Sequence, residues 1–194
     1  MTRGGQGLAR VAVVVRAGAA PLWWTGVVAA GTGALVPGLT GRRIGVLAGA
    51  VLFLVAVAAV AYTRRGRYRA LARSAARAGK HDVLQDRAVS ARNWRRGHRW
   101  WLLLAFLAAV GSAFVLPAAG GLLMAGWGVG LWLKAAWVGR LEQADDTLLW
   151  VRVDWLDRRA GGAAGKRVKG YRTTGIAAGD AAPGGARRRT PVAV

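Results

Sequence analysis

The sequence predicts an all-α membrane protein with four transmembrane helices arranged as two hairpins, a cytoplasmic helical stalk and a disordered basic tail. Of its 194 residues 54% are hydrophobic, yet the formal net charge is +21. Apolar residues gather in runs long enough to cross a bilayer, and basic residues gather between and after those runs. The chain contains no Cys, which excludes disulfides, Cys-ligated metals and thiol chemistry.

Four apolar runs are the predicted spans, because a helix needs about 20 mostly apolar residues to cross the hydrocarbon core. They cover residues 17–36, 44–62, 100–116 and 121–138. The first run is rich in Gly and contains Pro21, which a helix tolerates in its first turn. An interfacial or re-entrant helix is the alternative for this run.

Small residues recur at four-residue spacing in three of these runs. They are Gly45 and Gly49, Gly126 and Gly130, and Ala105, Ala109 and Ala113. Such spacing lets helix backbones approach closely. We expect it to serve packing within the four-helix bundle, with dimerisation as the alternative.

The distribution of basic residues predicts the orientation. Twelve Lys and Arg lie in residues 63–99 and eleven in residues 140–189, whereas the two outer turns contain only Arg42 and Arg43. The positive-inside rule then places both termini and the central loop in the cytoplasm. Residues 1–16 form a cytoplasmic N-terminus, which we expect to be retained because its apolar stretch is too short for a signal peptide. Lys134 is expected to snorkel toward the same face.

The cytoplasmic loop 63–99 contains no Pro and is rich in Ala, Arg and Leu, which favour helices. We expect the second span to continue past Arg77 without a break and the chain to turn near Gly79. Asp82 is a candidate N-cap for a helix that leads into the third span. Together these helices would form a stalk.

Residues 139–159 are predicted to form an amphipathic cytoplasmic helix, because Leu141, Leu148 and Trp155 recur every seven residues. Its acidic residues Glu142, Asp145 and Asp146 are expected to pair with the basic stalk. A helix lying on the membrane surface is the alternative. Residues 160–194 contain too little apolar surface to fold alone and are predicted to be a disordered basic tail.

Little in the sequence indicates catalysis. The two His residues, His81 and His98, lie at opposite ends of one predicted helix of the loop, and no acidic residue lies inside a span. Intramembrane ionisable residues mark ion paths, so the absence of acids argues against a coupled carrier. We expect no enzymatic activity, no cofactor and no metal site.

The function we expect is that of a non-enzymatic membrane accessory or scaffold protein that presents a basic surface to a cytoplasmic protein partner or to a second copy of itself. The alternative is a membrane anchor that contacts DNA or anionic lipid. Basic clusters beside a span attract anionic headgroups and neutralise DNA phosphates. The candidate polyanion-binding residues are Arg64, Arg65, Arg67, Arg69, Arg73, Arg95, Arg96, Arg99, Arg187, Arg188 and Arg189.

Arginine-rich stretches flank the second and third predicted spans, with the sequences TRRGRYRALARSAARAGK and ARNWRRGHRWW. With the Ala, Val and Gly-rich spans, this layout resembles that of the small membrane spread proteins of actinobacterial conjugative plasmids and integrative elements. The resemblance covers most of the chain as a layout and carries no diagnostic motif. It implies an accessory role in plasmid transfer, that is, conjugation at the cell membrane.

Overall fold

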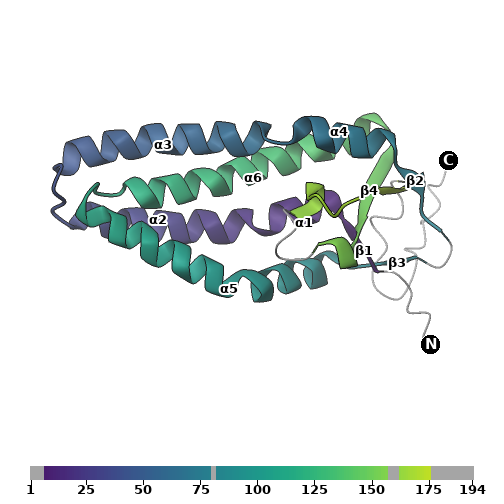
Figure 1. Cartoon of the computed structure of the whole chain (residues 1–194), viewed down its shortest axis with the longest axis horizontal. Coiled ribbons are helices and arrows are strands. Elements are labelled where there is room, and N and C mark those ends of the chain that lie inside the picture. The colour runs from purple at the N-terminus through teal and green to yellow at the C-terminus, as the bar shows by residue number, and fades with distance from the viewer. Residues whose placement is uncertain (1–6, 80–81, 157–161, 176–194) are drawn as a thin grey trace, which may run out of the picture.

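A computed structural model of the chain describes residues 7–79, 82–156 and 162–175. Long helices run side by side along the long axis of the molecule, and a small sheet lies at one end of them (Figure 1). The first and last described residues, Gly7 and Gly175, both belong to this sheet. The molecule therefore has a helical half and a sheet half.

The helical half contains a helix at each of the four predicted apolar runs. Its helices are α1 (Val11–Ala17), α2 (Ala19–Leu35), α3 (Arg42–Tyr62), α5 (Arg87–Gly111) and α6 (Ala119–Ala144), and the short 3-10 helix η1 (Ser112–Phe114) extends α5. Pro21 is the third residue of α2, where its missing N–H breaks no helical hydrogen bond, as predicted. Gly41 has φ of 80° in the turn before α3, a conformation that glycine adopts readily.

Three segments of the described chain are long and apolar enough to cross a membrane: Val11–Leu35, Arg42–Arg73 and Ala119–Ala144. The third predicted span is not among them. Its α-helical part runs only from Trp100 to Gly111, about 18 Å at 1.5 Å per residue, and arginines occupy the preceding turns of α5. The structure thus supports three of the four predicted spans by length and composition.

Helix α6 is the centre of the helical half and packs against α3 and α2. Small residues make this possible, because a Cβ at Gly126 would meet the backbone of Phe53 and one at Gly121 would overlap Ala30. Gly45 similarly contacts Pro117. These contacts confirm the prediction that the small residues serve helix packing within the chain. Helix α5 lies against α1 and α2 rather than against α3 (Figure 1).

The sheet half contains five strands in the order β2-β5-β4-β1-β3. They are β1 (Gly7–Arg10), β2 (Ala76–Arg77), β3 (Val83–Leu84), β4 (Thr147–Arg152) and β5 (Arg172–Gly175). Strand β4 is antiparallel to β1 and β5, while β1 with β3 and β2 with β5 are parallel pairs. Segments from both ends of the described chain and from its middle therefore meet in one sheet.

The predicted helix over residues 139–159 is wrong. Helix α6 ends at Ala144, and β4 is followed by the 3-10 helix η2 (Val153–Trp155). Side chains alternate along β4: Leu148 and Trp150 pack with Leu8, whereas Leu149 and Val151 enter the larger core cluster. A strand buries apolar residues on two faces in this way, whereas the seven-residue spacing of Leu141, Leu148 and Trp155 was coincidental.

The predicted continuous stalk is also wrong. After α3 the chain bends at Arg64, whose φ of 63° is left-handed, and α4 (Arg65–Arg73) follows. The segments 76–77 and 83–84 are edge strands, because β5 and β1 supply their backbone partners. Asp82 caps no helix: its carboxylate accepts a hydrogen bond from the Gly79 N–H at 2.8 Å, and α5 begins after Asp86.

The predicted disorder of residues 160–194 is wrong for residues 162–175, which contain the 3-10 helix η3 (Gly162–Ala164) and β5. Tyr171 is buried, and its hydroxyl donates a hydrogen bond to the Ala163 carbonyl at 2.8 Å. It belongs to a core cluster with Val11, Val138 and Val151, which ties the sheet to α1 and α6. Residues 176–194 lie outside the described residues.

Candidate functional site

Helix α4 carries four of the predicted polyanion-binding arginines at the junction of the two halves, and a fifth, Arg64, is its N-cap residue. Its buried face consists of Tyr68 and Leu71. The Tyr68 ring packs edge-on against Trp137 of α6, with ring centroids 6.4 Å apart. Arg69 and Arg73 are exposed. The amphipathic pattern of α4 thus packs one face of the helix on α6 and leaves Arg69 and Arg73 exposed.

Three of these arginines also make contacts within the protein. The Arg65 guanidinium lies 4.0 Å from the Tyr62 ring centroid, and its Nε donates to the Ala61 carbonyl at 2.9 Å. Arg67 donates from Nη2 to the Gly165 carbonyl at 2.8 Å. The Arg69 guanidinium lies 5.5 Å from the Trp137 centroid. Stacking holds a guanidinium plane in place while leaving N–H groups free for a carboxylate or phosphate.

The remaining described candidates, Arg95, Arg96 and Arg99, are exposed on the N-terminal half of α5. Arg99 lies over Trp100, 5.6 Å from its centroid. Nearby, Trp94 and His98 stack with centroids 4.3 Å apart, and His98 Nδ1 lies 2.9 Å from the Trp94 carbonyl oxygen. Arg187, Arg188 and Arg189 lie outside the described residues.

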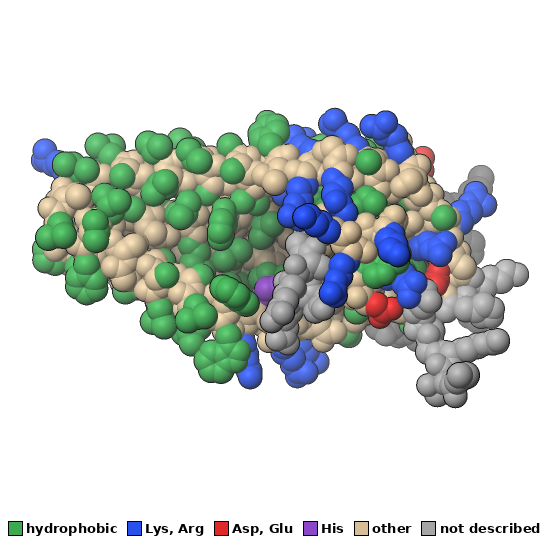
Figure 2. Space-filling model, viewed as in Figure 1, with side chains coloured by type: hydrophobic (Ala, Val, Ile, Leu, Met, Phe, Trp, Pro, Cys, Tyr) green, Lys and Arg blue, Asp and Glu red, His purple; other side chains and the backbone are tan. Residues whose placement is uncertain are grey.

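The predicted site is divided rather than continuous. Helix α4 and the arginine-bearing part of α5 lie at opposite edges of the molecule (Figure 1). On the face shown in Figure 2, Lys and Arg side chains gather over the sheet half and its junction with the helices, whereas hydrophobic side chains dominate the helical half. The arginines therefore form a band around the junction, not one patch.

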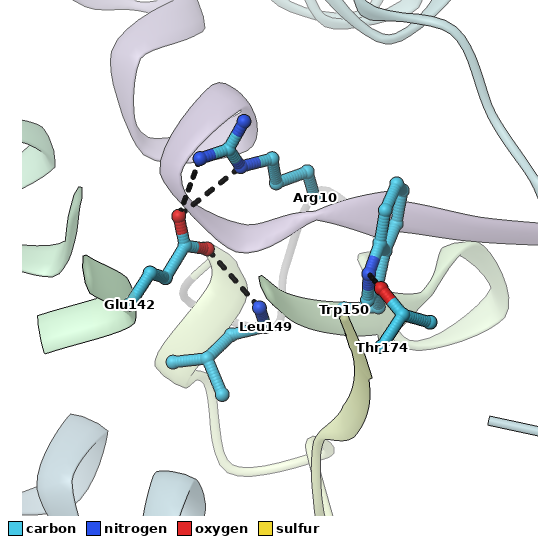
Figure 3. A network of polar contacts seen from close by, with 5 residues as sticks. All are labelled: Arg10, Glu142, Leu149, Trp150 and Thr174. Carbon is cyan, nitrogen blue, oxygen red and sulfur yellow. Dashed lines mark hydrogen bonds and ion pairs between the residues drawn. The ribbon is translucent and has the colours of Figure 1, made fainter. Parts of the chain in front are cut away.

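Acidic residues do not neutralise this band in the way we predicted. Glu142, whose side chain is 1% exposed, pairs with Arg10 of β1 at 2.6 Å and accepts the Leu149 N–H at 3.1 Å (Figure 3). Asp145 and Asp146 are exposed in the turn between α6 and β4. The carboxylate expected to bind the stalk instead fixes β1 and β4 to the end of α6.

Several residues relevant to the surface were missed from the sequence. Arg77 and Arg172 are exposed on the paired edge strands β2 and β5, and Lys166 and Lys169 are exposed before β5. The signal for β4 was present, since TLLWVRV is rich in the aromatic and β-branched residues typical of strands. Lys134 does not snorkel to an exposed position but is 7% exposed beside a cavity.

Tyr171, in the buried core beneath the band, has a shifted pKa. Burial raises the pKa of the Tyr171 phenol, and the neighbouring Tyr68 raises it further while Arg67 opposes both. Tyr171 therefore stays neutral well into alkaline solution. Within residues 7–79, 82–156 and 162–175, no group of three or more His, Cys, Asp or Glu side chains is placed to hold a metal ion.

Comparisons with protein-family models, with curated proteins and with solved structures find no match to this chain.

Proposed function

We propose that the protein is a multi-pass cell-membrane protein with four crossing helices, and that the sheet half and both termini lie in the cytoplasm. The three segments that are apolar and long enough to cross support the membrane location. The fourth crossing is α5 with its continuation to Leu116, where Trp101, Leu104 and Phe114 are 68%, 57% and 64% exposed. Such a surface is suited to lipid rather than water.

Strand pairing supports the even number of crossings. Strand β1 precedes α2, strands β2 and β3 lie between α4 and α5, and β4 and β5 follow α6, yet all five share one sheet. An open sheet cannot straddle a bilayer, because its backbone groups need partners. The chain between any two strands therefore crosses an even number of times. Since α6 is apolar enough to cross, α5 crosses with it.

The orientation follows from charge. The sheet side of the molecule carries the arginines of α4 and α5, and the opposite turn between α2 and α3 carries only Arg42 and Arg43. The positive-inside rule assigns the sheet side to the cytoplasm.

The role we propose is that of a non-enzymatic accessory or scaffold protein whose junction presents a basic surface to an acidic protein partner or a second copy. The observation that supports this role is the band of exposed arginines on the folded sheet half and its junction. The described residues contain two salt bridges, Arg10–Glu142 and Arg152–Asp154. Charge complementarity of this kind selects partners and speeds association.

Site-specific photo-crosslinking in cells tests the scaffold role. A photoreactive residue at Arg73 should give a discrete protein adduct, and charge reversal of Arg69 and Arg96 to Glu should weaken it. The matched control position is Leu47 of α3, which is 69% exposed on the helical half. Identical adducts from both positions, or an Arg73 adduct indifferent to charge reversal, would contradict the proposal.

A second candidate is contact with DNA, as an accessory to conjugative transfer, which the exposed arginines on both α4 and α5 favour. Phosphate contacts predict affinity that falls linearly with salt on logarithmic axes and ignores sequence. In neutral detergent, Arg69→Gln with Arg73→Gln should lower that slope by about two, one per contact. Arg42→Gln with Arg43→Gln, on the far side of the membrane, should leave it unchanged. Equal slopes in the two double variants would exclude this mode on α4.

A further inference from the structure

A cavity of about 1020 Å³ lies at the junction of the two halves, between α3, α4 and α6 on one side and α1 and α5 on the other. Figure 2 shows the hollow on the face between α3 and α5, where hydrophobic side chains give way to basic ones. Its volume is at the upper end of the range of ligand sites in proteins. The scaffold role does not use this cavity.

The cavity is lined by a lysine whose side chain is largely buried. Lys134 of α6 lines it and is 7% exposed. Among the described residues its ammonium makes no hydrogen bond and no ion pair, and Arg64 and Arg65 act on it with like charge. A buried charge is costly unless it is paired. An anion in the cavity would pair with this lysine.

The remaining polar lining has the same sign. Arg64 at the start of α4 and Arg96 of α5 reach the cavity from opposite sides, and Ser90 and Asn93 add hydrogen-bonding groups. Of the described residues lining the cavity, Asp154 is the one acid, and its carboxylate is bound by Arg152 Nη2 at 3.1 Å. The two arginine groups that the fold separates thus converge here with Lys134.

The other part of the lining is apolar. Val60 of α3 and Trp127 and Leu131 of α6 line the cavity toward the helical half. Helix α5 packs on α1 and α2 rather than on α3, so the cavity opens sideways between α3 and α5. Tyr62 and Trp137 lie at about the same position along the helices as the cavity. Tyr and Trp favour the headgroup region of a membrane.

We propose that this cavity binds the phosphate headgroup of an anionic membrane phospholipid, with its acyl chains leaving between α3 and α5. Lys134, Arg64 and Arg96 meet the phosphate, and Val60, Trp127 and Leu131 contact the upper acyl chains. Basic pockets between helices on the cytoplasmic side of a membrane are suited to such headgroups. The sideways opening and apolar lining favour a lipid over a soluble anion.

Native mass spectrometry of the full chain in zwitterionic detergent tests the site. Delipidated protein should retain one phosphatidylglycerol at concentrations where phosphatidylcholine is lost. Lys134→Met, which keeps the side-chain volume, should weaken phosphatidylglycerol binding at least about tenfold, because a buried charged hydrogen bond is lost. Arg96→Gln should weaken it about fivefold. Arg95→Gln is the matched control: it removes the same charge from the adjacent residue, which does not line the cavity, and should leave binding unchanged.

Thermal unfolding gives a second measurement that does not depend on retention in the gas phase. Phosphatidylglycerol should raise the Tm of the wild-type protein and not that of Lys134→Met. Equal binding of phosphatidylcholine, or unchanged phosphatidylglycerol binding by Lys134→Met, would overturn the proposal. Tighter binding of glycerol phosphate or inorganic phosphate than of phosphatidylglycerol would overturn the choice of a lipid.

Discussion

The helical half and the sheet half of this molecule are held together by different physical means. In the helical half, backbones approach through Gly26, Gly121, Gly126 and Gly128, and large apolar side chains such as Leu47 and Leu54 point outward. In the sheet half, Leu8, Val151 and Tyr171 are buried and arginines are exposed.

The difference reflects the two solvents. Lipid tails are as apolar as leucine, so helices in a bilayer gain little from hiding leucine and associate through close backbone packing. In water, burial of apolar surface is the main driving force. The same chain therefore places small residues at the contacts of one half and large residues at those of the other.

The largest expected effect comes from filling a helix contact. Gly121→Val should destabilise the protein by more than about 3 kcal/mol, because even its Cβ would overlap the backbone of Ala30. The yield of monodisperse protein in detergent and its Tm measure this. Gly31→Ala, with open space at its Cβ, is the control and should change stability by less than about 1 kcal/mol. Equal loss in both variants would show that helix propensity rather than close contact matters here.

The sheet half should be sensitive to its ion pair. Glu142→Ala leaves Arg10 and the Leu149 N–H without their acceptor, and loss of one partner of a buried pair costs about 3 kcal/mol. Limited proteolysis should then cut the sheet half faster while the helical half stays protected. Asp145→Ala, three residues further on and exposed, should change stability by about 0.5 kcal/mol or less. Faster cleavage in both halves at once would contradict the view that the two halves are stabilised by different interactions.

A smaller effect is expected at the bond between Trp150 Nε1 and Thr174 Oγ1, which is 2.7 Å long (Figure 3). Thr174→Val leaves the indole N–H of buried Trp150 unpaired, at a cost of about 1–2 kcal/mol. The matched variant is Thr173→Val, whose hydroxyl makes an exposed bond of 3.4 Å to Ala76. The Tm difference between the two variants measures the indole bond, and a zero difference would show that it contributes nothing.

The weakest expected effect at neutral pH is that of Tyr171. Its pKa is raised above the ordinary value of 10.0 by burial, so the folded state holds the proton more tightly than the unfolded chain. Stability is then complete below pH 10 and falls as the pH rises above it, where the unfolded chain ionises. Tyr171→Phe should lose about 1 kcal/mol at pH 7 with its hydrogen bond to Ala163. Its Tm should also fall less steeply above pH 10, and an unchanged slope would contradict this assignment.

Much of the helical half was predictable from sequence, because an apolar run such as 44–62 defines its helix locally. The sheet was not predictable in this way. Its strands β2 and β3 are two residues long, and each exists only because a distant segment supplies hydrogen-bond partners. The burial of Tyr171 likewise depends on residues of α1 and α6 that are distant in the sequence, such as Val11 and Val138.

The candidate site was predicted in composition but not in arrangement. Apart from half-buried Arg65, the arginines of α4 and α5 are exposed, as their charge requires, but the left-handed turn at Arg64 and the β2 and β3 pairings separate them. The cavity that brings Arg64 and Arg96 back together around Lys134 depends on the open side of the helical layer, which no local pattern in the sequence reveals.

Cysteine accessibility tests the central claim, that four helices cross and the sheet lies inside, most directly. The chain has no native Cys, so single substitutions report without background. In intact cells, a membrane-impermeant maleimide should label Thr40→Cys and Val115→Cys, in or beside the two outer turns, and should label Ser74→Cys and Thr173→Cys only after permeabilisation. Labelling of Ser74→Cys or Thr173→Cys in intact cells, or protection of Val115→Cys until permeabilisation, would contradict the account.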